Sequence, residues 1–234
     1  MITITVIGSS SAGNCYVVSN GDTRLMLECG LPWKKIKQEI GYTTSSIDGV
    51  LVTHEHQDHL KAGKDVIKAG LDLYLSKGTA EAANLTGHRV HHVTPRKQFI
   101  TGTFTILPFD VEHDAAEPLG YLLASNTTKE RVLFLTDTSY CKYQFKGVTH
   151  LMIECNFCDE ILEHNIASGR VEPSRRHRLL RSHMSLQRVK DFIKANDMSK
   201  LQAVWLCHLS NDNSNEVKFK DQIQRLTGVP VTVC

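Results

Sequence analysis

The chain has 234 residues, of which 41% are hydrophobic and 22% are charged. A chain of this length and composition can bury a full core, which excludes disordered, collagen-like and coiled-coil structures. Its 27 basic and 25 acidic residues leave a formal charge of only +2, which excludes a polybasic coat for nucleic acid or membranes. No linker, low-complexity run or repeat divides the sequence, so we expect a single domain over residues 1–234.

Short β-rich runs alternate with helical patterns along the chain. Runs of β-branched and apolar residues predict strands, and apolar residues at helical spacing predict helices. The expected strands are residues 2–7, 16–19, 24–27, 49–53, 71–75, 103–107, 119–124, 131–136, 151–154, 203–207 and 229–233, and the expected helices are residues 61–69, 79–85 and 186–195, the last capped by Ser185. This order predicts an α/β layered fold in which helices cover two packed sheets, with a doubly wound sheet as the alternative.

Neither membrane-spanning nor export signals are evident. The longest apolar runs, such as residues 203–207, are far shorter than the roughly 20 residues that cross a bilayer. Residues 1–7 lack the charged and apolar regions of a signal peptide. We therefore expect a cytoplasmic protein with no membrane partner.

Seven cysteines, an odd number in a chain of this size, favour reduced thiols over a disulfide framework. Cys155 and Cys158 form a C-x-x-C pair, for which a structural zinc site is the alternative. A second pair at zinc-finger spacing is missing, so we expect idle or buried thiols.

The segment 157–182 is rich in arginine and poor in apolar residues. Its basic residues are Arg170, Arg175, Arg176, Arg178 and Arg181, with His164 and His177. We interpret it as an insertion or lid, with a solvated helix face as the alternative. Because guanidinium groups bind phosphate in fork geometry, we expect Arg175 and Arg178 to contact an anionic substrate.

Four metal-ligand side chains follow the buried strand at residues 49–53, in the order His54, His56, Asp58 and His59. On an extended backbone, His54 and His56 project to the same side, and a turn would then direct the other two side chains to a second position. Four such residues within six positions rarely arise by chance. The cluster therefore predicts a loop that supplies ligands to two metal ions.

A dinuclear site needs more ligands than this loop holds. His113, Asp137 and His208 each stand where a predicted strand stops and a loop begins, which is where an α/β sheet presents ligands. We expect these three side chains to complete the site.

The motif from His54 to His59 matches H-x-H-x-D-H, and the chain resembles the metallo-β-lactamase fold superfamily. The resemblance implies a four-layer αββα sandwich and two divalent ions. His54, His56 and His113 would hold the first ion, and Asp58, His59 and His208 the second, while Asp137 would bridge them. Five imidazoles and two carboxylates make Zn²⁺ the expected metal, with Mn²⁺ or iron as alternatives.

Within that superfamily the chain is similar to YycJ/WalJ-like hydrolases and phage anti-Pycsar proteins. The similarity lies in residues 8–14, 113–118, 136–138, 154–156 and 208–213. It implies either a nuclease or an enzyme that cleaves cyclic nucleotides, the latter in the host cytoplasm if a phage encodes the chain. It also implies a homodimer, so a contact between subunits is the alternative to substrate binding for the segment 157–182. Glu28 departs from the pattern, because the family usually has Asp at this strand end.

The resemblance also assigns residues to catalysis. His183, in the segment 182–185, is similar to a histidine that pairs with a glutamate corresponding to Glu154, which would make His183 the proton donor to the leaving oxygen. The alternative is that His183 merely precedes the helix capped by Ser185. We expect Asp58, His183 and Glu154 to take part in catalysis, and Asn156 to join Arg175 and Arg178 in substrate binding.

The sequence thus predicts a dinuclear metal-dependent phosphodiesterase that hydrolyses 3′,5′-cyclic nucleotides to nucleoside monophosphates. A YycJ/WalJ-like DNA exonuclease is the alternative, with nucleic acid as the partner. A third reading is a metal-binding module without catalysis, or a thioester or lactam hydrolase of the same fold, since one fold hosts many chemistries.

Overall fold

The computed structural model describes residues 1–234 as two compact units. Unit 1 comprises Met1–Asp110 and Ala115–Glu130, and unit 2 comprises Val111–Asp114 and Arg131–Cys234. None of the helices combines the length and apolar character needed to cross a membrane.

Unit 1 contains a six-stranded sheet in the order β1-β2-β3-β4-β5-β6. Its strands are β1 (Thr3–Gly8), β2 (Cys15–Ser19), β3 (Arg24–Leu27), β4 (Gly49–Leu51), β5 (Leu73–Leu75) and β6 (Val90–His92). The first three strands pair antiparallel through short turns, whereas β3 to β6 pair parallel. Parallel neighbours need crossover connections, and here these contain α1 (Trp33–Glu39), the 3₁₀ turn η1 (Thr44–Ser46), α2 (Gln57–Leu60), α3 (Gly63–Lys68) and α4 (Lys77–Ala82).

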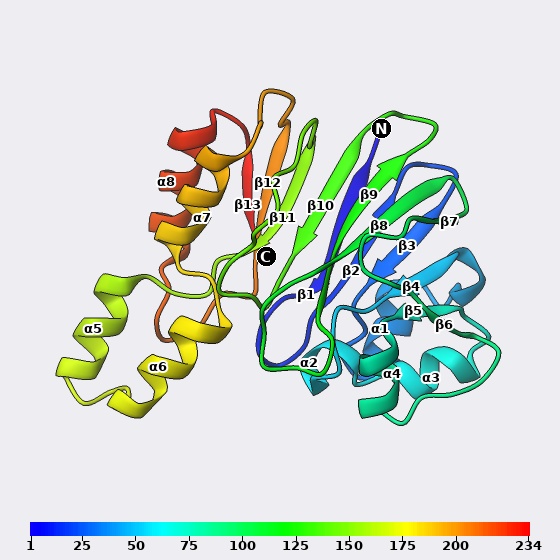
Figure 1. Ribbon diagram of the computed structural model, residues 1–234, viewed down its shortest axis with the longest axis horizontal. Helices are drawn as coiled ribbons and strands as arrows, with labels where there is room; N and C mark the ends of the chain where they lie inside the picture. The colour runs from blue at the N-terminus through cyan, green and yellow to red at the C-terminus, as the bar shows by residue number, and fades with distance from the viewer. The chain divides into compact units, whose positions relative to one another are not determined.

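The crossover helices cover the parallel part of this sheet. Figure 1 shows α1, α3 and α4 gathered beside β4, β5 and β6. Ile36 of α1 and Val66 of α3 are fully buried and belong to one core cluster with Val50 and Leu73 of the sheet. Burying such side chains contributes about 1.5–3 kcal/mol each, which fixes the strand ends that carry the motif of unit 1.

A three-stranded antiparallel segment completes unit 1. It consists of β7 (Phe99–Thr101), β8 (Phe104–Asp110) and β9 (Leu119–Ser125). The buried hydroxyl of Tyr121 donates to the carbonyl of Val52 at 2.7 Å, and the amide of Leu119 donates to the carbonyl of Thr53 at 3.0 Å. These bonds tie β9 to the stretch immediately before His54.

Unit 2 contains parallel strands in the order β13-β12-β11-β10. They are β10 (Arg131–Leu135), β11 (His150–Glu154), β12 (Ala203–Cys207) and β13 (Val231–Val233), and their crossovers include α7 (Leu186–Ala195) and α8 (Glu216–Thr227). All of β11 is buried, as expected for a strand covered on both faces. Helices α7 and α8 pack against each other (Figure 1), and α7 buries Val189, Phe192 and Ile193 at helical spacing.

The arginine-rich segment forms two helices with a small core of their own. These are α5 (Asp159–Ala167) and α6 (Pro173–Ser182), which lie together in Figure 1, apart from α7 and α8. Phe157, Leu162 and Val171 form the core, with Leu179 and Leu180 of α6 packed against it. The segment is therefore a packed helical pair with an exposed basic surface.

The strands and helices expected from the sequence are present, although several are shorter. The strand expected at 49–53 ends at Leu51 and that at 229–233 begins at Val231. Helix α7 has the expected bounds, and the Ser185 side chain caps it by accepting from the Arg188 amide. Sequence patterns missed β6, β7, α1, α2, α5, α6 and α8. His183 follows Ser182, the last residue of α6, and precedes Ser185, which caps α7.

Candidate active site

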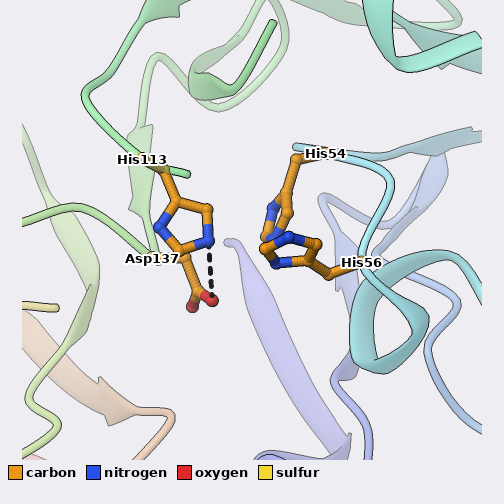
Figure 2. A group of neighbouring side chains, drawn as sticks. All are labelled: His54, His56, His113 and Asp137. Carbon is orange, nitrogen blue, oxygen red and sulfur yellow. Dashed lines mark ion pairs between the residues drawn. The ribbon is translucent and has the colours of Figure 1, made fainter. Parts of the chain in front are cut away.

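The first candidate ligands of unit 1 lie in the loop between β4 and α2. The rings of His54 and His56 lie with their centroids 4.6 Å apart and their planes at 80° (Figure 2). Nδ1 of His54 is 2.9 Å from the hydroxyl oxygen of Thr53, which orients the ring. The alternating side chains therefore meet on one side of the backbone, as expected from the sequence.

Helix α2 brings the other two motif residues to the same place. The buried ring of His59 lies 4.2 Å from the ring of His54, and its Nε2 is 3.4 Å from the Oδ2 of Asp58. Asn14 holds this turn, because its backbone amide donates to the Asp58 carbonyl at 2.7 Å and its side-chain nitrogen is 3.2 Å from His59 Nε2. All four ligands of the motif thus gather within unit 1.

Asn14 was not singled out from the sequence. In the sequence it is only a polar residue between the expected strands 2–7 and 16–19. In the structure its side chain is buried, with 1% exposure. A buried amide needs hydrogen-bond partners, and those of Asn14 include groups on Asp58 and His59 as well as Ser10 and Tyr16.

Glu28 and Gly30 pack beneath the same turn. Oε2 of Glu28 lies 3.6 Å from Nδ1 of His59, and its other oxygen accepts from the Thr53 amide at 3.2 Å. Burial raises the pKa of the Glu28 carboxyl above its ordinary value, while the interactions with His59 and Thr53 act in the opposite direction. Although longer than the usual Asp, Glu28 still reaches a motif histidine. A Cβ on Gly30 would lie 1.8 Å from the Asp58 carbonyl oxygen, so only glycine fits there.

The candidate ligands of unit 2 surround Asp137. Its Oδ2 lies 3.7 Å from Nε2 of His113 (Figure 2), and its Oδ1 lies 3.7 Å from Nε2 of His208. Nδ1 of His113 is 3.1 Å from the carbonyl oxygen of Ser182, an acceptor that fixes the proton on Nδ1 and turns Nε2 toward the carboxylate. One carboxylate therefore faces two histidines, each through a different oxygen.

These donor atoms fit a divalent cation. Separations of 3.7 Å are too long for hydrogen bonds. Two atoms that bind one tetrahedral ion at about 2.0–2.2 Å lie about 3.3–3.6 Å apart, close to the observed separations. Glu154 and His183 lie beside this pair, since one atom from each is within 4.8 Å of atoms of Asp137 and His208. Imidazole and carboxylate ligands suit zinc and other first-row metals.

Behind this cluster, buried Glu154 at the end of β11 orients His183. Oε1 of Glu154 is 2.5 Å from Nδ1 of His183, and its Oε2 accepts from the amides of Met184 at 3.1 Å and Thr138 at 3.3 Å. The ring of His183 stacks near that of His208, with centroids 5.6 Å apart and planes at 15°. The structure thus joins the two residues that the sequence resemblance paired.

The expected substrate-binding residues fall in three different settings. Asn156 is buried, and its side-chain nitrogen lies 3.1 Å from Nδ1 of His208 and donates to the carbonyl of His208 at 2.9 Å. This geometry supports positioning of His208. Arg178 lines a cleft beside His113, whereas Arg175 lies on exposed α6 outside the residues that line it. Substrate contact by all three remains a prediction.

Strained backbone marks the strand ends that carry these residues. Glu28, Asp137 and His208 have φ values of 63°, 45° and 52°, in the left-handed region that non-glycine residues seldom adopt. Each follows the end of β3, β10 or β12. Such strain costs about 1–3 kcal/mol per residue and concentrates at functional sites.

Comparisons with known proteins agree with this geometry. A family model described as "Beta-lactamase superfamily domain" matches residues 25–209. Exodeoxyribonuclease YycJ of Bacillus anthracis is 28% identical over 228 residues, covering 90% of this chain and 83% of that protein. Anti-Pycsar protein Apyc1 of Paenibacillus xerothermodurans is 36% identical over 64 residues, covering 24% of this chain and 25% of that protein.

A comparison with solved structures shows the same fold. The crystal structure of the metallo-β-lactamase fold protein YhfI from Bacillus subtilis has a TM-score of 0.76 at 19% identity, covering 100% of this chain and 97% of that chain. The expected fold class is confirmed, and so is a cluster of histidine and aspartate side chains suited to metal binding. Because the family model spans well over half of the sequence, this chain belongs to the metallo-β-lactamase superfamily and is a hydrolase.

Proposed function

We propose that this hydrolase is a metal-dependent phosphodiesterase that cleaves DNA. The observation that carries the proposal is the 2.5 Å hydrogen bond between Glu154 and His183, set beside Asp137 and His208. It supplies a positioned proton donor next to candidate metal ligands, which is what expulsion of a phosphodiester's leaving oxygen requires.

Seven side chains would hold two divalent ions in this proposal. We assign His54, His56 and His113 to one ion, Asp58, His59 and His208 to the other, and Asp137 to both. Support comes from the family membership, from the gathering of the motif residues within unit 1 and from the placement of Asp137 between two histidines within unit 2. The donor set favours Zn²⁺, with Mn²⁺ or iron as alternatives.

When bound, such ions would activate water and neutralise the charge of the phosphate. The chain's own part is to hold and move the proton. Glu154 accepts from the amides of Met184 and Thr138. Because a carboxylate can only accept, we place the proton of its bond to His183 on Nδ1, which leaves Nε2 as the ring atom that would donate to the leaving oxygen. The side-chain nitrogen of Asn156 keeps His208 in place through contacts with the ring and the backbone carbonyl of His208.

DNA is the preferred substrate class because of how much of the chain each relative covers. The similarity to the exodeoxyribonuclease covers 90% of this chain, whereas that to the anti-Pycsar protein covers 24%. Cyclic nucleotides, our first expectation from the sequence, are therefore the second candidate, supported by the higher identity of that shorter match.

A direct test incubates the metal-loaded protein separately with linear duplex DNA, with 3′,5′-cyclic CMP, UMP, AMP and GMP, and with a lactam. Nucleotides released from DNA, and their loss in the His183→Asn variant with metal content intact, would support the proposal. Turnover of cyclic nucleotides alone would favour the second candidate. Hydrolysis of the lactam without any phosphodiester cleavage would refute both.

A further inference from the structure

A cleft of about 720 Å³ opens beside His113 within unit 2. Its lining includes Glu112, His113, Asp114, Arg178, Arg181 and Ser182. Ser182 connects the cleft to the site described above, because its carbonyl oxygen contacts His113 and its neighbour is His183. The volume is within the roughly 300–1,000 Å³ typical of ligand pockets.

One face of α6 forms the basic wall of this cleft. Ser174, His177, Arg178 and Arg181 recur at intervals of three or four residues, which places them on the same side of the helix. Leu179 packs against the small core around Phe157, which holds the helix in place. The two arginines therefore project from an anchored helix.

Arginines near the cleft differ in what they already bind. Arg188 donates from Nη1 to the carbonyls of Ser139 and Leu180, so its guanidinium is part of the wall. Arg176 pairs with Glu163 outside the cleft at 2.6 Å. Arg178 and Arg181 line the cleft with exposed side chains, and their planar guanidinium groups match the oxygens of a phosphate.

Two carboxylates oppose this positive charge. Glu112 and Asp114 flank His113 and also line the cleft. An anion is therefore best accommodated along α6, away from those two side chains. A substrate that places one phosphate at the His113 and His183 end and another at α6 needs at least two phosphates.

We infer that Arg178 and Arg181 form a subsite for a second, non-reacting phosphate, which makes the substrate a polynucleotide strand. The inference rests on the proposed phosphodiesterase function and specifies its substrate. A cyclic mononucleotide carries a single phosphate and cannot occupy the reactive position and this subsite together. The subsite thus selects strands over cyclic mononucleotides by binding.

The test compares the thymidine dinucleotide TpT, which has one phosphate, with the trinucleotide TpTpT, which has two. The wild-type protein should cleave TpTpT with a KM roughly ten-fold lower, the expected worth of one charged hydrogen-bonding contact. The double variant Arg178→Gln/Arg181→Gln should lose this preference and show similar KM values for TpT and TpTpT. Arg176→Gln, which removes one positive charge from the same helix outside the cleft, should keep it.

Bis(4-nitrophenyl) phosphate separates failure of the subsite from failure of the chemistry. It has one phosphate, so it reports on the chemistry without the subsite, and Arg176→Gln should hydrolyse it as the wild type does. A double variant that still prefers TpTpT, or a wild type without the preference, would overturn the subsite while the phosphodiesterase stands. If the wild type cleaves none of these phosphodiesters, the proposed function fails and the subsite with it.

Discussion

Replacing Glu154 by Gln tests the proposed proton donor, His183, without changing any of the seven proposed metal ligands. The carboxylate accepts three hydrogen bonds, from His183 at 2.5 Å, Met184 at 3.1 Å and Thr138 at 3.3 Å. Glutamine has one accepting oxygen. If that oxygen still accepts from the two backbone amides, the NH₂ group of the glutamine faces the Nδ1–H of His183. The ring must then turn away or lose that proton.

Either response moves the ring that would donate the proton away from its place. We expect kcat for DNA to fall about 10²–10⁴-fold, the usual contribution of a general acid, with KM and metal content little changed because Glu154 acts through His183. The lost charged hydrogen bond should lower the free energy of unfolding by about 1.5–3 kcal/mol.

Rapid-quench kinetics, elemental analysis and urea unfolding measure these quantities. The matched control is Glu160→Gln, an exposed carboxylate on α5 that pairs with Lys218, for which kcat should not change. Full activity of Glu154→Gln, or a loss accounted for by missing metal, would refute the role given to the pair.

Further predictions concern the ligands, the turn beneath them and the thiols. Asp137→Asn should reduce bound metal below two ions per chain and abolish turnover while circular dichroism stays native; full metal content would contradict its bridging role. Gly30→Ala would force the Asp58 backbone from a 1.8 Å contact, and such overpacking should cost about 1–3 kcal/mol of stability and reduce metal affinity; an unchanged melting temperature would argue against the close approach. Burial raises the pKa of the Cys155 thiol well above its ordinary value, so iodoacetamide should label partly exposed Cys234 first in mass spectra.

Local sequence determined the motif and most of the strands. The four ligands from His54 to His59 were recognisable because an extended backbone sends alternate side chains to one side, and this needs no distant contact. The buried strands were recognisable from apolar runs between turn residues, as in residues 203–207. Helix α7 had both an apolar stripe and a serine cap, so its bounds were correct.

Distant contacts decided the rest. Helix α6 has few apolar residues, and it is held by Leu179 and Leu180 against a core that only folding assembles. Residues 29 positions apart make the Glu154–His183 bond, and residues 44 apart join Asn14 to Asp58. Spacing in the chain cannot encode such distances, because the path of the backbone between the residues sets them. For that reason the sequence could name candidate ligands. The Ser182 carbonyl that fixes the ring of His113, the close approach of Gly30 to Asp58 and the basic wall of α6 became visible only in three dimensions.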